Sequence, residues 1–359
     1  MTRLEMFFAG CLAIPALAGA QTVPPAPPSQ PAAPAAQPGP APEFPAVRIG
    51  MVSYLQYDDE IENQAGLNAF DVTRAYVNIN AQVSRNVRFR FTPDVRRVTD
   101  GSLNGTLTVR VKYAFAQFDD TTHGAWLRAG MHQTPWLDFE ESINRYRVQG
   151  TMFAERDGLI PGSADFGVSY FRPLPHGFGE FHVGVYNGEG YAHAESNKYK
   201  SVEGRLTVRP LPARGIAKGL RLSGFYNAGW YDHDQPRRLG IVMASFEHAH
   251  LVATVQHLTA KEHPLPTATD DTDRSGSSAF LEVRQGTQGW AGLARFDHFD
   301  PDGQRPGDSH DRALAGGAYW FVWPRARVGV VTTLEYVSYG AAAAHLREGR
   351  LLAQTHVEF

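Results

Sequence analysis

Apolar and polar side chains alternate along most of the chain from Ala46 onward, in segments of about ten residues that end at turn residues. Helical periodicity is scarce. In the stretch 105–118, for example, large apolar residues occupy every second position from Leu107 to Phe115. The alternation predicts sixteen strands, at 46–57, 69–82, 86–97, 105–118, 124–132, 164–172, 178–187, 200–209, 219–231, 238–246, 249–258, 277–285, 289–298, 311–322, 326–338 and 350–359.

The connections between these strands alternate in length. Those after even-numbered strands are mostly short, and those after odd-numbered strands are longer and more polar, with the longest at 133–163. This rhythm is typical of a membrane barrel with tight periplasmic turns and long outer loops. The sequence therefore predicts an all-β fold, a 16-stranded antiparallel transmembrane β-barrel. Aromatic residues near strand ends are expected to form two girdles at the bilayer boundaries; they are Tyr113, Phe115, Trp126, Tyr226, Trp230, Trp290, Phe296, Trp320, Phe321, Trp323, Tyr336 and Tyr339.

The beginning of the chain predicts export. Residues 1–20 read as a signal peptide, with an early Arg3, an apolar stretch and a small-residue cleavage site. Residues 21–45 are rich in Pro and Ala, and we interpret them as a periplasmic linker that acts as a simple tether or contacts the cell wall. Cleavage after residue 20 removes the single cysteine, Cys11, and leaves 46–359 as the barrel domain in the cell outer membrane.

Charge assigns the two faces of each strand. Basic and acidic residues number 34 and 37, and this balance argues against a nucleic-acid partner. Because a charge facing lipid costs about 2–4 kcal/mol at the bilayer midplane, the charged positions should face the lumen. On the early strands these positions form a basic wall: Arg74, Arg88, Arg90, Arg110, Lys112 and Arg128.

The longest connection supplies opposing charges. If it folds into the lumen, its charged residues form a constriction: Asp138, Glu140, Glu141, Arg145, Arg147, Glu155 and Arg156. A basic wall that faces acids creates a transverse field, and rings of Arg or Lys favour anions. The alternative interpretation is that these arginines merely solvate a water-filled lumen.

Short motifs resemble the phosphate-selective porin O and P family in their order and spacing. They begin at Gly130-Met131-His132-Gln133-Thr134-Pro135-Trp136 and continue through Phe153-Ala154-Glu155-Arg156, Asp165-Phe166-Gly167-Val168 and Gly184-Val185-Tyr186-Asn187-Gly188. The resemblance covers essentially 46–359. It implies a porin whose third loop folds into the lumen, a homotrimer and an anionic solute, with phosphate as one candidate. The family usually carries Lys where this chain has Gln133, and Arg where it has Ala164, which weakens the case for phosphate.

We therefore expect a passive diffusion channel for small hydrophilic solutes with a bias toward anions, with outer-membrane lipid and lipopolysaccharide as further partners. No enzyme activity is expected, and no cofactor motif is present. His248 and His250 lie at a predicted turn without a third metal ligand. Two alternatives stay open: a structural or adhesive anchor, and a lipid hydrolase, which would carry a Ser and a His together on the lipid face near the outer rim. None of the serines at 169, 223 and 245 is paired with a His by the pattern alone.

Overall fold

The computed structural model describes residues 43–62, 66–98, 101–230, 235–263, 270–343 and 347–359. The predictions of a signal peptide at 1–20 and of a linker at 21–45 fall outside these residues, except for the last three linker positions. Within the described residues, no helix is both long and apolar enough to span a bilayer.

Sixteen strands form one closed antiparallel barrel in which each strand pairs with its chain neighbours and β1 pairs with β16. The predicted fold class is confirmed. The strands are β1 (Ala46–Glu62), β2 (Asn68–Gln82), β3 (Val87–Arg97), β4 (Leu107–Asp120), β5 (Ala125–Gln133), β6 (Ala164–Pro173), β7 (Gly179–Tyr186), β8 (Ser201–Val208), β9 (Leu220–Trp230), β10 (Pro236–His248), β11 (Leu251–Glu262), β12 (Thr272–Arg284), β13 (Gly289–Asp300), β14 (His310–Trp323), β15 (Ala326–Tyr339) and β16 (Arg347–Glu358).

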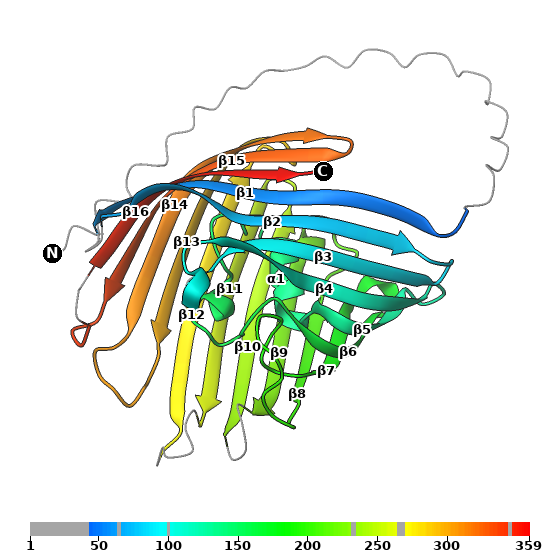
Figure 1. The fold of residues 1–359 in the computed structure, drawn as a ribbon, viewed down its shortest axis with the longest axis horizontal. Helices are drawn as coiled ribbons and strands as arrows, with labels where there is room; N and C mark the ends of the chain where they lie inside the picture. Colours follow the sequence, from blue (N-terminus) through cyan, green and yellow to red (C-terminus); the bar gives the residue numbers. More distant parts are fainter. Residues whose placement is uncertain (1–42, 63–65, 99–100, 231–234, 264–269, 344–346) are drawn as a thin grey trace. The chain divides into compact units, whose positions relative to one another are not determined.

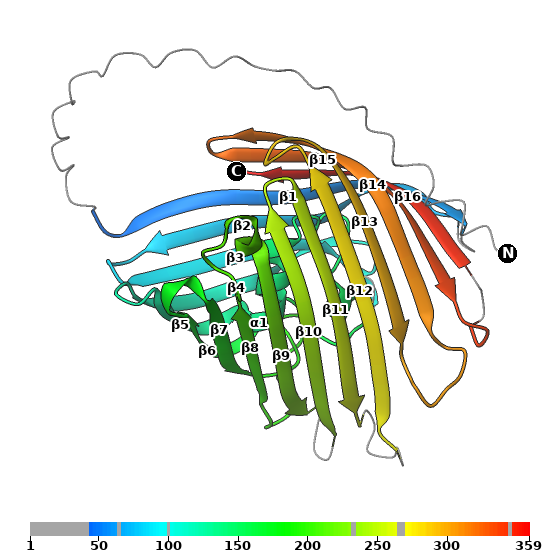
Figure 2. The ribbon, with the colours of Figure 1, turned by 180° about the vertical axis from the view of Figure 1, so that it is seen from behind.

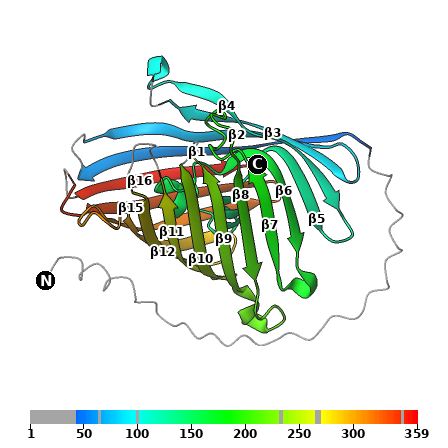
Figure 3. The ribbon, with the colours of Figure 1, turned by 90° about the horizontal axis from the view of Figure 1, so that it is seen from below.

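The strands are strongly tilted, as barrel closure requires. In Figure 1 the near strands β1 to β4 cross the far strands β8 to β12 at a steep angle, and Figure 2 shows the same crossing from behind. The described helices are short: α1 (Pro135–Ile143), α2 (Phe153–Arg156) and the 3-10 turns η2 (Gly101–Leu103), η3 (Pro175–Gly177) and η4 (Gly215–Gly219). In Figure 3 the hairpin of β3 and β4 projects beyond the neighbouring strands.

Several strands are longer than predicted at the ends that lead into the long loops. β1 continues to Glu62 instead of ending at 57, and β12 begins at Thr272 instead of 277. The added residues are polar except for Ile61, so the apolar alternation stops before the ladder of backbone hydrogen bonds does. The short-and-long rhythm of the connections has three exceptions. The segment 209–219 after β8, which contains η4, is long, and the segments 63–67 after β1 and 231–235 after β9 are short.

A β-bulge corrects the predicted facing of β4. Thr92 pairs with Tyr113 while Pro93 pairs with Val111, so Lys112 is the extra residue. After an extra residue the alternation changes face. As a result, Tyr113 and Phe115 turn into the barrel and are only 6% and 5% exposed, rather than forming part of an aromatic girdle.

Other predicted girdle residues divide between the two faces. Trp126 stacks on Phe171 inside the barrel, and Trp320 is fully buried there. In contrast, Trp290 and Trp323 are 64% and 52% exposed on the outer face, near the ends of β13 and β14 that meet short turns. An aromatic residue near a strand end is thus a girdle residue only when its parity faces outward.

Candidate functional site: a constriction inside the barrel

The segment 134–163, between β5 and β6, packs against the inner face of the barrel. Trp136, Leu137, Phe153 and Leu159 are fully buried. They belong to one apolar cluster with inward side chains of β9 to β15. Those side chains are Phe225, Leu239, Ile241, Met243, Val252, Leu258, Phe280, Leu293, Leu314, Trp320 and Val331. Burying a side chain of this size stabilises the folded state by about 1.5–3 kcal/mol. In Figures 1 and 2, seen from opposite sides, α1 lies between the near and the far strands.

Polar contacts fix the same segment to the strands opposite the basic wall, β9 to β16, which we call the far wall. Arg145 forms an ion pair of 2.5 Å with Glu282 of β12, whose side chain is 1% exposed. Gln149 donates a hydrogen bond of 2.9 Å to Glu335 of β15, and Gln354 of β16 donates one of 2.7 Å to the Val148 carbonyl. These are the contacts of a loop folded into the barrel. Partly exposed cations lie on the inner face of β2 to β4, and we infer that the open part of the lumen borders these strands.

Two arginines of the basic wall share one carboxylate. Arg74 of β2 and Arg110 of β4 contact the same oxygen of Asp94 of β3, at 3.1 and 3.2 Å. The Asp94 side chain is fully buried, whereas each guanidinium is about one-fifth exposed. Arg110 also donates to the Tyr191 hydroxyl and stacks 4.3 Å above the ring of that residue. One carboxylate between two guanidinium groups leaves one positive charge uncompensated.

Arg90 and Lys112 have neutral partners only. Arg90 donates to Asn78 at 2.7 Å and stacks 4.4 Å above the Tyr113 ring. Lys112 is 2% exposed, donates to the Tyr76 hydroxyl at 2.9 Å and lies 4.5 Å above the same ring. Within the described residues, no carboxylate is recorded within 4.0 Å of either cation, so no ion pair neutralises the two charges. Arg90 is partly exposed on the inner face, whereas the buried Lys112 acts on the lumen only through its electric field.

The other two residues of the predicted basic wall differ from each other. Arg128 lies 3.9 Å above the Trp126 ring, with a longer ion contact of 3.8 Å to Asp138. Arg88 lies near the turn between β2 and β3 and forms a bidentate pair with Asp119 at 2.5 and 2.6 Å. Asp119 therefore compensates the charge of Arg88 closely, whereas the more distant Asp138 compensates the charge of Arg128 only weakly.

Two of the predicted loop carboxylates are partly exposed, and a third, Glu155, is held within the loop. Asp138 and Glu141 have side chains 38% and 25% exposed. Arg147, which is nearly buried, pairs with Glu141 at 3.2 Å and with both oxygens of Glu155. Burial alone would raise the pKa of Glu155. The positive charges of Arg147, Lys112 and Arg74 outweigh that effect and hold the pKa below its usual value.

The remaining predicted loop residues face the far wall instead of the open lumen. Glu140 accepts hydrogen bonds from Trp136 at 3.0 Å and from Gln256 at 2.6 Å. Its burial raises its pKa to about 7, although the nearby Arg295 acts in the opposite direction. Arg156 approaches Glu335 at 3.8 Å, and burial lowers its pKa to about 9. With Arg145, these residues anchor the loop.

No family model matches the chain, and no curated protein matches it. Solved structures match nearly all of the barrel. The anion-selective porin from Comamonas acidovorans gives a TM-score of 0.61 at 12% identity, covering 88% of this chain and 99% of that one. OmpT, an outer membrane protein of Vibrio cholerae in its trimer form, gives 0.59 at 11%, covering 88% and 100%. The outer membrane channel DcaP of Acinetobacter baumannii gives 0.60 at 11%, covering 87% and 97%.

The chain has the porin fold. At identities of 10–12% this likeness shows the architecture alone.

The constriction of this porin fold contains three tyrosines, of which the sequence pattern missed Tyr76 and Tyr191 and assigned Tyr113 to the outer girdle. Tyr76 and Tyr113 carry the stacked cations of β3 and β4, and Tyr191, from the connection after β7, covers Arg110. The signal available for Tyr76 was its parity with the lumen-facing Arg74, whereas the bulge at Lys112 hid the inward direction of Tyr113. No local signal marks Tyr191, because it reaches Arg110 across 81 residues of sequence.

Two serines lie within hydrogen-bond distance of histidines, and the sequence pattern did not predict either arrangement. Inside the barrel, Ser169 Oγ lies 2.7 Å from His132 and 3.1 Å from His182, and all three residues are buried. On the outer face, Ser277 Oγ of β12 lies 2.9 Å from His257 Nδ1 of β11. Among the described residues, no group of three or more His, Cys, Asp or Glu side chains is placed to hold a metal ion.

Proposed function

We propose that the chain is an outer-membrane porin, a passive diffusion channel for small hydrophilic solutes that favours anions. The observation that carries this proposal is the pair Arg90 and Lys112, two cations in the lumen with neutral hydrogen-bond partners only. Cations that line a pore raise the local concentration of anions. The channel moves solutes down their gradients and catalyses no reaction.

The balance of charge around the constriction supports the bias. Its cations are Arg74, Arg90, Arg110, Lys112, Arg128 and Arg147, and its carboxylates are Asp94, Asp138, Glu141 and Glu155. Two positive charges remain after pairing. Their aromatic partners stabilise the cations through the ring faces without neutralising them, so the positive potential persists in the lumen.

The solute is a small anion without strong preference for phosphate. Arg128 donates to Gln133 at 3.1 Å, and this neutral amide stands where the phosphate-selective family usually has Lys. Asp138 and Glu141 would also repel a doubly charged anion. The proposal therefore covers the porin and its anion bias, and it does not include selectivity for phosphate.

The proposal includes the cell outer membrane as the site of action, with its lipid and lipopolysaccharide as partners, export through residues 1–20 and a linker at 21–45. It also includes a homotrimer. One similar structure, OmpT of Vibrio cholerae, is in a trimer form.

Reversal potential tests the proposal. The purified protein in a planar bilayer, with 0.1 M and 1 M KCl on the two sides, should give a potential on the anion-selective side of zero. Added phosphate should not block the chloride current. A cation-selective potential would contradict the anion bias, and absence of channels would contradict the porin.

A second candidate function, lipid hydrolysis, is favoured by one observation. Ser277 and His257 are hydrogen-bonded on the outer face, and on the next strands His298 Nδ1 lies 2.7 Å from Asp311. A nucleophile, a base and an orienting acid are the parts of a hydrolase. However, His298 and not His257 contacts the acid. Phospholipid hydrolysis that disappears in Ser277→Ala would support this function over the channel.

A further inference from the structure

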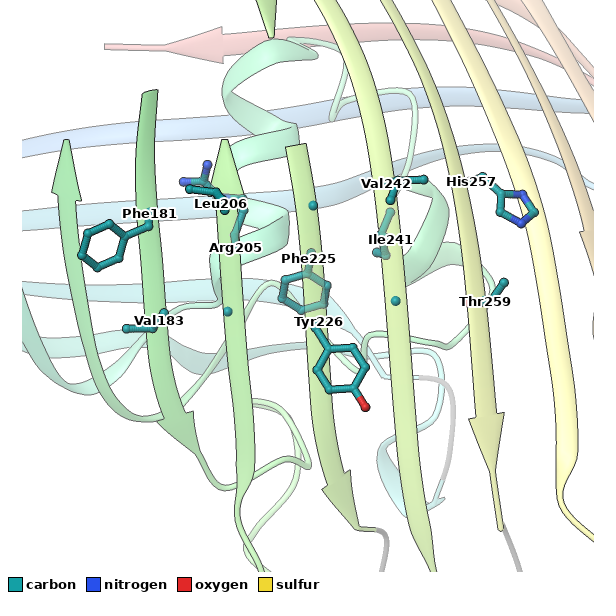
Figure 4. Close-up of a pocket in the computed structure, with 13 residues that line it drawn as sticks. Phe181, Val183, Arg205, Leu206, Phe225, Tyr226, Ile241, Val242, His257 and Thr259 are labelled. Atoms are coloured by element: carbon teal, nitrogen blue, oxygen red, sulfur yellow. The ribbon is translucent and has the colours of Figure 1, made fainter. Parts of the chain in front are cut away.

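A shallow groove runs across the outer face of the barrel from β7 to β11. Its volume is about 810 Å³, which is within the range of pockets that hold small ligands. Figure 4 shows its lining, to which five strands contribute. The outward side chains are Phe181, Val183, Leu206, Tyr226, Val242, His257 and Thr259.

Three glycines create the depth of this groove. Gly204, Gly224 and Gly240 lie on adjacent strands among large apolar neighbours. A Cβ at Gly224 would meet nothing within 4 Å, and one at Gly240 would meet only the Thr259 hydroxyl, at 3.7 Å. Backbone packing therefore does not require glycine at these two positions. Their effect is to leave space for a ligand on the outer face of the barrel.

The groove has an apolar end and a polar end. Phe181 lies near the end of β7 that adjoins the turn with η3, whereas Thr259 lies near the end of β11 that leads into a long loop. Under the proposed function, the long loops face the cell exterior, so the polar end is the outer one. Four strand spacings of ~4.8 Å give a length of about 19 Å, and a tilt of about 45° turns this into a depth near that of one leaflet.

Basic side chains lie beyond the polar end of the groove, closer to the outer rim of the barrel. Arg238 is exposed on the same face as Gly240, two residues closer to the outer rim, and pairs across the ladder with Lys261. Lys261 forms a 3.2 Å ion pair with Asp271, whereas within the described residues no carboxylate partner is recorded for Arg238. His257, Thr259 and Ser277 add hydrogen-bonding groups just below.

We propose that this groove binds one lipid A molecule of the outer leaflet, with an acyl chain along the glycines and a phosphate at Arg238. This occupant satisfies both ends, because the apolar lining accepts the chain and the guanidinium forks onto a phosphate. The inference rests on the membrane orientation of the proposed function. A second copy of the chain would cover the apolar part, but it would supply no phosphate for Arg238.

Native mass spectrometry of the full chain in detergent tests the site, with lipid A and phosphatidylcholine as probes. Gly224→Leu fills the groove and should weaken binding of both lipids at least tenfold. Gly292→Leu is the matched control, because Gly292 also faces outward with nothing within 4 Å of a Cβ but lies on β13, away from the groove. Gly240→Val is the second filling variant if the first does not fold.

The head-group arm uses Arg238→Gln, which should weaken lipid A at least tenfold and leave phosphatidylcholine unchanged. Arg347→Gln, an exposed position on β16, is its control. Equal lipid A binding in Gly224→Leu and Gly292→Leu would overturn the proposal. A change of oligomeric state without a change of lipid binding would overturn it in favour of a second copy. Conductance of the same samples separates this failure from failure of the channel, because groove variants leave the lumen intact.

Discussion

Replacing Arg90 by Gln removes one uncompensated charge from the constriction and should reduce the preference for anions. For an ion that passes about 5 Å from the guanidinium, the interaction in water is about 0.8 kcal/mol. A Debye length of ~10 Å at 0.1 M salt reduces it to about 0.5 kcal/mol. A cation is repelled as strongly as an anion is attracted, so the anion-to-cation permeability ratio should fall about fivefold, since 1.36 kcal/mol corresponds to tenfold.

Salt concentration and a matched variant check this reasoning. At 1 M salt the Debye length is ~3 Å, and the same substitution should change the ratio by less than about twofold. Arg97→Gln is the control, because it removes the same charge from the same strand but from the outer face, where Arg97 pairs with Asp71. Reversal potentials in KCl gradients provide the ratio. An equal effect of the two variants, or an effect that persists at 1 M, would refute a local charge in the lumen.

Three further predictions concern the loop and the outer face. The pKa of Glu140 is raised to about 7, so the folded state binds more protons than the unfolded state between about pH 4.5 and 7. The free energy of unfolding should therefore fall as the pH rises through this window. The temperature of the heat-induced gel shift should drop from pH 5 to pH 8 in the native chain but not in Glu140→Gln. Arg145→Ala leaves the buried Glu282 carboxylate short of a partner and should cost about 1–3 kcal/mol, giving an earlier gel shift and noisier single-channel currents, whereas Arg325→Ala in an exposed turn should change neither. Ser277→Ala should leave channel conductance unchanged and alter no lipid turnover; loss of a measurable phospholipase activity would instead establish the hydrolase.

The architecture could be predicted because two constraints act on every strand. A lipid-facing side chain must be apolar, and every strand edge must be paired, which makes alternation and an even strand count visible in the sequence. Arg74 and Arg90 were assigned to the lumen by parity in the same way. Their partners could not be assigned, because Asp94 and Asn78 come from other strands and the alignment between strands is not encoded in parity alone.

The loop shows a second limit of prediction from sequence. Glu140 and Glu141 are adjacent in sequence, and both look like lumen acids. In α1 successive residues are rotated by about 100°, so Glu140 turns into the far wall toward Gln256, while Glu141 is partly exposed beside Arg147. Which face of such a short helix is buried depends on the apolar residues Trp136 and Phe139 and on the wall they meet.

The strands that the loop covers can be recognised in the sequence, because their pattern departs from simple alternation. β10 has apolar residues on both faces, because Leu239, Ile241 and Met243 point inward while Val242 and Ala244 point outward. A strand that is apolar on both faces is buried on both. In a barrel whose outside is covered by lipid, this means that protein, and not water, covers the inside. The early strand β3 keeps strict alternation with Arg88 and Arg90 and faces open lumen. A break in alternation along an otherwise alternating barrel therefore marks the area on which the inserted loop rests, and the strands that keep alternating mark the channel.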